Sequence, residues 1–302
     1  MAGTTPFSAS ARVDLDRVSL QATVLGNRIG GPAVVFEAGA GGFGAQWCHI
    51  QPLVAAHTVT VSYDRAGLGR SEPGPSPRSP EAIGDELAAL LTALEIRPPV
   101  VLVGHSLGGL LVRHFAGRRL DDVAGLVLVD ASHELQMTRA GLPSWVVGAT
   151  RLVNGVKAVL ARWPRLGRAM AARTAADGRE SLTPAQWEHY LSLAGRPAGF
   201  ATMRAEAAHF DSLFGHGHSV PTHVGEVPVR IVTAGASLAG TSRRLGAMHR
   251  ENQADLLRLS ADATQVTVPG ATHLSILLDR RHARAVADAV IDVVGQTTEP
   301  GS

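Results

Sequence analysis

One serine between two glycines carries the clearest chemical pattern in the sequence. Residues 104–108 read GHSLG, a G-x-S-x-G pattern that follows the aliphatic run at 100–103 and precedes a helical pattern at 110–116. Strand, sharp turn and helix form the context in which a turn lifts a serine hydroxyl out of a sheet. A β-carbon at Gly104 or Gly108 would clash in so tight a turn. We therefore predict that Ser106 is a nucleophile; the alternative is a glycine-rich turn with an incidental serine.

A serine hydroxyl is a weak nucleophile until a neighbouring base takes its proton, and thirteen histidines compete for that role. His273 follows the last apolar run, at 264–268, and precedes the last helical pattern. Because parallel strands all end at one edge of a sheet, this position predicts that His273 lies at the same edge as Ser106. Other histidines fit less well, since they precede a strand, face away within the turn or lie inside helices: His57, His105, His114 and His282.

The elements that must position these side chains are short apolar runs alternating with helical patterns. The runs are rich in β-branched residues and lack strict alternation, which favours strands buried on both faces of a parallel sheet; they lie at 33–36, 58–63, 100–103, 126–129, 227–232 and 264–268. Helical patterns occur at 79–95, with Ser79 as N-cap and Pro80 at the first position, and at 241–260 and 280–294. Alternating strands and helices predict an α/β fold.

Taken together, the motifs resemble those of the α/β-hydrolase-fold serine hydrolases, the esterase- and lipase-like superfamily. The resemblance extends from about residue 12 to 294 and rests on three segments: GHSLGG at 104–109, GATH at 270–273, and YDRAGLGRS at 63–71, which is similar to the family's D-R-x-G-x-G-x-S loop. It implies a mostly parallel central sheet flanked by helices and covered by a helical cap.

The resemblance also implies a carboxylate that orients the histidine. In most such hydrolases this acid follows the strand after the cap, but residues 233–240 contain no carboxylate. Asp130 directly follows the run at 126–129, a position that some branches of the fold use, and the chain order Ser…Asp…His is kept. We expect Asp130 to be the acid, with Glu134 and Asp255 as weaker substitutes. The alternative for Asp130 is a structural turn-capping role.

A glycine-rich loop after the first parallel strand occupies the place of the family's H-G-x-x-G oxyanion loop. Residues 37–42 read EAGAGG, with Ala38 in the position of the histidine. By that alignment the backbone N–H groups of Ala40 and Leu107 are the expected oxyanion donors, each contributing about 2.7–4 kcal/mol in the transition state.

Residues 135–221 show helical patterns and no strand pattern. We therefore predict a core made of 10–134 and 222–296 with an inserted helical cap at 135–221. The cap's tryptophans and methionines, and its apolar runs such as those at 152–153 and 159–160, suggest that the substrate has an apolar acyl or alcohol group. Between residues 151 and 179 the chain has seven cations and one acid, Asp177, and a solvated face is favoured over docking on anionic lipid or an acidic ligand. The cations are Arg151, Lys157, Arg162, Arg165, Arg168, Arg173 and Arg179.

Two competing classes of site use other residues. Gly39-x-Gly41-x-x-Gly44 after a strand, with Asp64 twenty residues on, is a dinucleotide fingerprint, and the loop also resembles the first motif of S-adenosylmethionine methyltransferases. The hydrolase-type loop after Asp64 argues against a bound nucleotide. A second pattern is a histidine group that lacks metal-ligand spacing, so a solvated loop is favoured and no metal is expected; it comprises His209, His216, His218 and His223.

Composition bounds the remaining choices. The 302 residues are 45% hydrophobic and 18% charged, which is typical of a globular protein. The formal net charge of +2 is too small to suggest a protein that binds nucleic acid. Cys48 is the single cysteine, expected to be buried in a helix, so no intrachain disulfide can form. No run suits a membrane span, and residues 1–12 do not read as a secretory signal, so a cytoplasmic location is expected.

The sequence thus predicts a cofactor-free enzyme for a small acyl substrate, either as a monomer or as a homo-oligomer. The expected reaction is hydrolysis of a carboxylic ester or lactone through a Ser-His-Asp triad and an acyl-enzyme. Acyl transfer, thioester or amide cleavage and perhydrolysis on the same triad remain alternatives.

Overall fold

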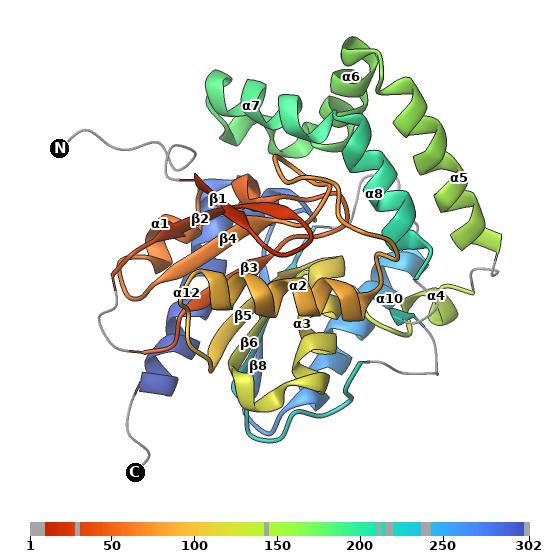
Figure 1. The fold of residues 1–302 in the computed structure, drawn as a ribbon. Helices are drawn as coiled ribbons and strands as arrows, with labels where there is room; N and C mark the ends of the chain where they lie inside the picture. Colours follow the sequence, from red (N-terminus) through yellow and green to blue (C-terminus); the bar gives the residue numbers. More distant parts are fainter. Residues whose placement is uncertain are drawn as a thin grey trace.

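A computed structural model describes residues 10–27, 31–141, 145–209, 213–214, 220–236 and 243–298. Its centre is one eight-stranded sheet in the order β1-β2-β4-β3-β5-β6-β7-β8 (Figure 1). The strands are β1 (Ser10–Asp14), β2 (Ser19–Leu25), β3 (Val34–Glu37), β4 (Thr60–Asp64), β5 (Val100–His105), β6 (Val123–Val129), β7 (Val229–Ala234) and β8 (Ala263–Val268). The β1–β2 and β2–β4 pairs are antiparallel, and every pair from β4 to β8 is parallel.

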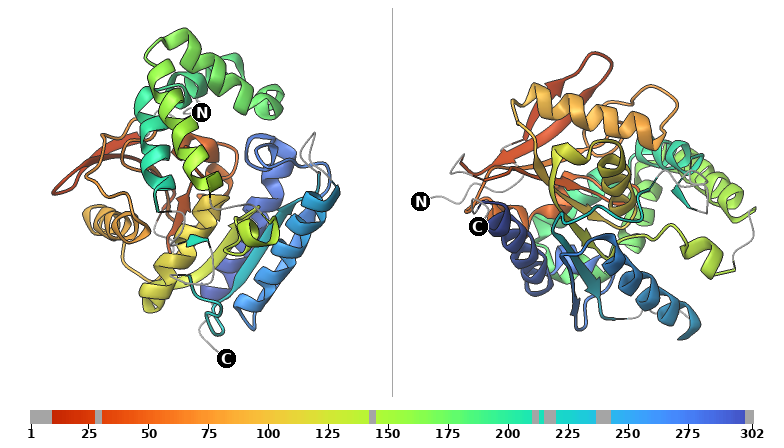
Figure 2. Two further views of the ribbon diagram at one scale, coloured as in Figure 1. Left: turned by 90° about the vertical axis from the view of Figure 1, so that its right-hand side faces the viewer. Right: turned by 90° about the horizontal axis from the view of Figure 1, so that it is seen from below.

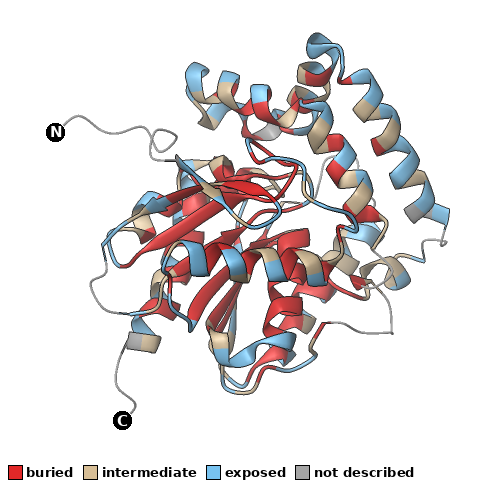
Figure 3. Ribbon diagram, viewed as in Figure 1, coloured by how far each residue is buried: buried red, intermediate tan, exposed pale blue. Residues whose placement is uncertain are grey.

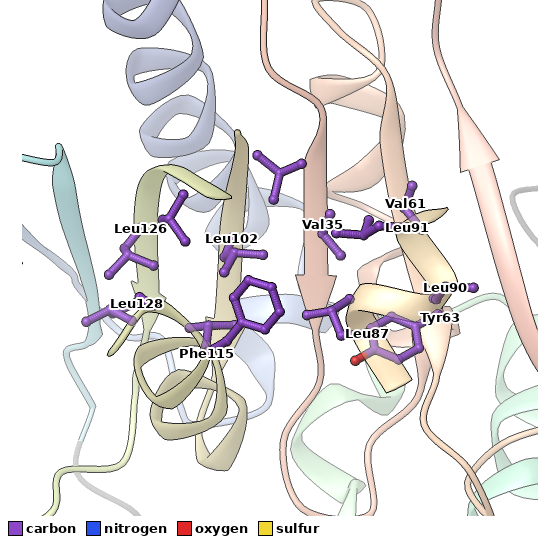
Figure 4. Close-up of a cluster of buried hydrophobic side chains, with 14 of the residues drawn as sticks. Val35, Val61, Tyr63, Leu87, Leu90, Leu91, Leu102, Phe115, Leu126 and Leu128 are labelled. Carbon is purple, nitrogen blue, oxygen red and sulfur yellow. The ribbon is translucent and has the colours of Figure 1, made fainter. Parts of the chain in front are cut away.

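Buried strands of the parallel part send successive side chains to opposite faces of the sheet. Leu102 of β5 packs in the cluster under α2 (Pro80–Ala93) and α3 (Leu107–Arg118), whereas Val101 and Val103 pack in the cluster on the other face. Figure 4 shows the first cluster, in which Leu87 and Phe115 lie against the sheet. Continuous aliphatic runs therefore form these strands because both of their faces are covered.

Helices cover both faces of the sheet, and a separate group of helices gathers at one end of the molecule (Figures 1 and 2). The short α1 (Gln51–Val54) and α11 (Ser275–Leu278) and the long α12 (Arg280–Thr298) pack on the face opposite α2 and α3. The remaining helices are α4 (Gln136–Arg139), α5 (Trp145–Leu160), α6 (Pro164–Thr174), α7 (Pro184–Ala194), α8 (Pro197–Ala207) and α10 (Arg243–Asp255), with 3-10 turns at Gly44–Trp47, Leu120–Asp122, Ala176–Ser181 and Leu256–Leu259.

The predicted elements are present with shifted ends. Strands expected at 58–63 and 227–232 lie at Thr60–Asp64 and Val229–Ala234, because apolar residues that precede a strand continue the pattern into its approach loop. The helix expected at 79–95 ends at Ala93, and Ser79 Oγ accepts the Ala82 N–H (3.3 Å) as its N-cap. Cys48 is buried as expected but follows a 3-10 turn, and burial raises the pKa of its thiol to about 12.

Helices α4 to α8 lie in the chain between β6 and β7, and α8 contacts the loops that follow β3 and β4. Thr202 and Met203 of α8 lie against Gly67 and Gly41, and Phe43 packs on Tyr190 of α7 with the ring centroids 5.2 Å apart. Because those loops follow the carboxyl ends of parallel strands, α7 and α8 lie over that edge of the sheet.

Candidate active site

Ser106 lies at the turn between β5 and α3, in a backbone conformation that residues other than glycine rarely adopt. Its φ is 53° and its ψ is −122°. A β-carbon at Gly104 would lie 2.5 Å from the Gly108 carbonyl oxygen, and one at Gly108 would lie 2.4 Å from the Glu37 carbonyl oxygen. The clash that we predicted for a β-carbon at either glycine is therefore confirmed, since the turn leaves no space for a side chain at these positions.

The structure brings together three side chains that are far apart in the sequence. His273 Nε2 lies 3.0 Å from Ser106 Oγ, and His273 Nδ1 lies 2.6 Å from Asp130 Oδ2. Ser106 follows β5, Asp130 follows the adjacent β6 with a φ of 42°, and His273 follows β8. This arrangement of a serine, a histidine and an aspartate has the geometry of a Ser-His-Asp triad.

A second histidine, which the sequence analysis did not single out, contacts the same carboxylate. His249 of α10 places Nε2 2.9 Å from Asp130 Oδ1, which also accepts the Ala234 N–H at 3.0 Å. Burial opposes ionisation of Asp130, but hydrogen bonds with His249 and His273 outweigh it and hold the pKa of Asp130 well below its ordinary value. The hydrogen bond to Asp130 raises the pKa of His249. No motif marks His249; only its place on the helix after β7, the strand beside β6, could have suggested it.

The histidine next to the nucleophile supports the loop that carries His273. His105 is buried, and its Nε2–H donates to the His273 carbonyl oxygen at 2.8 Å. Burial lowers the pKa of His105 to about 3, so its ring is neutral. A neutral ring bound to backbone suits a structural role better than that of a base.

Glu134 and Asp255, the two alternatives to Asp130, form hydrogen bonds with arginines. Glu134 receives two hydrogen bonds from Arg113, at 2.6 and 3.1 Å, and Asp255 receives one from Arg139 at 2.6 Å. Among the three carboxylates considered from the sequence, Asp130 is the one that contacts His273 within the described residues.

Ala40 lies in a tight turn beside Ser106, and Leu107 is the first residue of α3. The Gly42 N–H donates to the Gly39 carbonyl oxygen (3.1 Å), and a β-carbon at Gly39 would lie 3.0 Å from the Ser106 β-carbon. The turn therefore lies against the nucleophile. The first N–H groups of a helix lack partners within the helix, which makes that of Leu107 suitable for binding an anion.

Arg65 supports the glycine-rich loop at residues 37–42, in which Ala38 stands where the family's loop has a histidine. Its Nη1 donates to the Ala38 carbonyl oxygen (2.6 Å), and its Nη2 donates to the Gly39 carbonyl oxygen (3.0 Å). The guanidinium is buried between Glu37 (2.6 Å) and Glu206 of α8 (2.9 Å), and these two carboxylates outweigh the effect of burial and raise the pKa of Arg65. Arg65 belongs to the YDRAGLGRS segment at 63–71, but its partners could not be identified without the fold.

Residues proposed for the competing sites have other partners. The Asp64 carboxylate is buried and accepts the N–H groups of Gly44 (2.8 Å) and Arg70 (2.7 Å), so it is not presented to a ribose. No group of three or more histidine, cysteine, aspartate or glutamate side chains in the described ranges could hold a metal ion. His216 and His218 lie outside those ranges.

A cavity of about 470 Å³ opens beside Ser106 and His273. Its apolar wall comes from α4, the residue after it, and α10: Met137, Ala140, Leu245 and Met248. Neither the tryptophans of the predicted cap nor the apolar runs of α5 line this cavity. Trp145, Leu152 and Val159 face solvent instead, so the expectation that they mark an apolar substrate group fails for these residues. Met137, one of the methionines of the predicted cap, does line the cavity.

Comparisons with known sequences identify the family. The model of the alpha/beta hydrolase family matches residues 34–289. The chain is 33% identical over 100 residues to protein YqjL of Bacillus subtilis (strain 168), an alignment that covers 33% of this chain and 40% of that protein. It is also 33% identical over 135 residues to a human (lyso)-N-acylphosphatidylethanolamine lipase, covering 43% of this chain and 38% of the lipase. The chain thus spans less than half the length of these curated relatives.

Solved structures of low identity share the fold across nearly the whole chain. An esterase from Thermogutta terrifontis is 18% identical with a TM-score of 0.67, and the match covers 96% of this chain and 99% of the esterase. The enol-lactonase from Burkholderia xenovorans LB400 is 20% identical with a TM-score of 0.67, covering 94% and 100% of the two chains. In the described ranges no helix is long and apolar enough to span a bilayer. The family match and the shared fold together show that the chain belongs to the alpha/beta hydrolase family and has the fold of that family.

Proposed function

We propose that this hydrolase cleaves a carboxylic ester or lactone with Ser106 as its nucleophile. The observation that carries the proposal is the continuous contact from Ser106 through His273 to Asp130. His273 Nε2 takes the hydroxyl proton as Ser106 Oγ attacks the carbonyl carbon, and the proton then passes to the leaving alcohol. Asp130 accepts the Nδ1–H and stabilises the imidazolium. Water activated by His273 releases the acid from the acyl-enzyme and regenerates Ser106.

The developing oxyanion is held by the N–H groups of Ala40 and Leu107 in this mechanism. Both groups border Ser106, one in the turn at 39–42 and one at the start of α3. Arg65 holds the carbonyl groups of Ala38 and Gly39, so the turn is preorganised before the substrate arrives.

The substrate carries an apolar group next to the scissile carbonyl. This follows from the cavity wall of Met137, Ala140, Leu245 and Met248 beside the nucleophile. Fold neighbours described as an esterase and an enol-lactonase support the ester and lactone class. We also propose that residues 135–221 act as a cap on a core formed by 10–134 and 222–296, since α7 and α8 lie over the loops that border Ser106.

A fluorophosphonate label tests the nucleophile directly. The wild-type chain should gain one label at Ser106, located by peptide mass spectrometry, while Ser106→Ala should stay unlabelled and lose about 10⁶-fold in kcat. Ser132→Ala is the matched control, because Ser132 lines the same cavity and should keep the label. A labelled Ser106→Ala variant, or an unlabelled wild type, would refute the proposal.

Initial rates then separate the substrate classes. A panel of esters of increasing acyl length, lactones, thioesters and an anilide should show the highest kcat/KM for an ester or lactone. Release of the free acid, with no transfer to added alcohols or hydrogen peroxide, distinguishes hydrolysis from acyl transfer and perhydrolysis.

A further inference from the structure

Helix α5 turns most of its described apolar side chains toward solvent. Trp145 and Leu152 are 68% and 69% exposed, and Val153, Val156 and Val159 are at least 50% exposed. At 100° per residue, the exposed apolar residues of α5 occupy an arc of roughly 120°. Among the side chains described on α5, the buried one is Asn154, which lies on the opposite side of the helix. A surface helix of a soluble protein normally has the opposite orientation, so this apolar arc calls for a partner.

The apolar surface continues onto α6. Trp163, just before α6, is 59% exposed and Leu166 is 47% exposed. We call the exposed apolar residues of this region the α5–α6 face; they are Trp145, Leu152, Val153, Val156, Val159, Leu160, Trp163 and Leu166. Figure 3 shows the outer side of α5 exposed along its length, and Figure 1 shows that α5 lies at the periphery of the molecule.

The charged residues of the segment that carries the α5–α6 face all have one sign. Residues 145–174 contain no aspartate or glutamate and six cations: Arg151, Lys157, Arg162, Arg165, Arg168 and Arg173. Within the described residues only Arg168 among them forms an ion pair, with Glu188 of α7. On the helical wheel Arg151 lies on one side of the apolar arc of α5 and Lys157 lies on the other, while Arg162 follows the end of the helix.

We propose that the α5–α6 face binds the surface of a bilayer that contains anionic phospholipid. A helical segment with a tryptophan at each end, an apolar arc along its length and cations beside that arc has the pattern of a helix that lies in the membrane interface. Its apolar residues would lie among the acyl chains and its cations at the headgroups. The helix lies on the membrane and does not span it. A second copy of the chain is a poorer partner, because a symmetric interface would bring together two surfaces that each carry these cations and no acid.

Docking in this way has a consequence for the active site. Figure 1 places α4, α5 and α10 along the same side of the molecule, and α4 and α10 line the cavity beside Ser106. A bilayer bound to the α5–α6 face would therefore lie next to α4 and α10. An acyl substrate that partitions into lipid would then be close to the cavity. This consequence rests on the proposed function, but the docking itself does not.

Vesicle flotation of the full chain tests the proposal. We expect the chain to float with vesicles of phosphatidylcholine containing about 30% phosphatidylglycerol, to stay in solution with pure phosphatidylcholine, and to detach at high salt. Trp145 and Trp163 should shift their emission to shorter wavelength and be quenched by brominated lipid. Removing one cation, as in Arg162→Gln, should weaken partitioning about fivefold.

Paired variants separate the face from general effects of charge. The double variant Leu152→Glu/Val156→Glu should lose at least about tenfold in partitioning, because both carboxylates would have to enter the interface. Leu120→Glu/Val266→Glu adds the same charge at two exposed apolar residues outside the α5–α6 face and should bind like the wild type. Ser106→Ala should also bind, which keeps failure of the proposed catalysis distinct from failure of docking.

Three results would overturn the proposal. One is the absence of binding to anionic vesicles, and another is equal loss in both double variants. The third is a dimer in analytical ultracentrifugation that Leu152→Glu/Val156→Glu dissociates, without vesicle binding by the wild type, since the face would then join two copies of the chain.

Discussion

Replacing Asp130 with asparagine tests the proposed acid with little change in shape. Asp130 Oδ1 accepts hydrogen bonds from the Ala234 N–H and His249, and Oδ2 faces His273 Nδ1 at 2.6 Å. An asparagine oxygen that keeps the two partners of Oδ1 would turn its NH₂ group toward His273. The ring would then carry its proton on Nε2 and could not accept the proton of Ser106. We expect kcat to fall about 10⁴-fold, which corresponds to about 5 kcal/mol of transition-state stabilisation.

The assay is single-turnover acylation of a chromogenic ester, measured together with the rate of fluorophosphonate labelling. Both rates should fall, because both require deprotonation of Ser106. Glu134→Gln and Asp255→Asn are the matched controls, since each carboxylate is held by an arginine and neither contacts His273 in the described structure. Their kcat values should stay within about threefold of the wild type, and urea unfolding checks that every variant is folded.

A loss smaller than about tenfold in Asp130→Asn would refute the assignment. A larger loss in Glu134→Gln or Asp255→Asn, with the fold intact, would move the role to that carboxylate.

Two further changes probe the residues that support the site. His249→Gln should lower kcat about tenfold, the value of one charge-assisted hydrogen bond to Asp130. Because the pKa of His249 is raised in the folded state, its stabilising contribution is fully present below its unfolded pKa and is lost as the pH rises through the folded pKa. The difference in free energy of unfolding between wild type and His249→Gln should therefore be largest below about pH 6.5, and a difference independent of pH would refute this role. Glu206→Gln removes one of the two buried carboxylates that hold Arg65 and should destabilise the fold by about 1–3 kcal/mol in urea unfolding. Glu188→Gln, in an exposed pair on the same group of helices, should change stability by less than about 1 kcal/mol, and equal effects would contradict the importance of the buried pair.

Local patterns in the sequence determined the elements and the edge at which the chemistry lies. Aliphatic runs form the buried strands because both faces of the sheet are covered, and the glycines at 104 and 108 follow from the tightness of one turn. Parallel strands end at a common edge, so the order of elements was enough to bring Ser106 and His273 to the same side of the sheet.

Only the tertiary structure decided which side chains meet at that edge. Asp130 rather than Glu134 contacts His273, and His249 contacts the other oxygen of Asp130. Arg65 binds the carbonyl groups of Ala38 and Gly39. These partners come from elements far apart in the chain, and their contact depends on how whole helices and strands pack. The outward orientation of α5 has the same origin, because its periodicity shows an apolar arc but cannot tell whether that arc faces the protein or its surroundings.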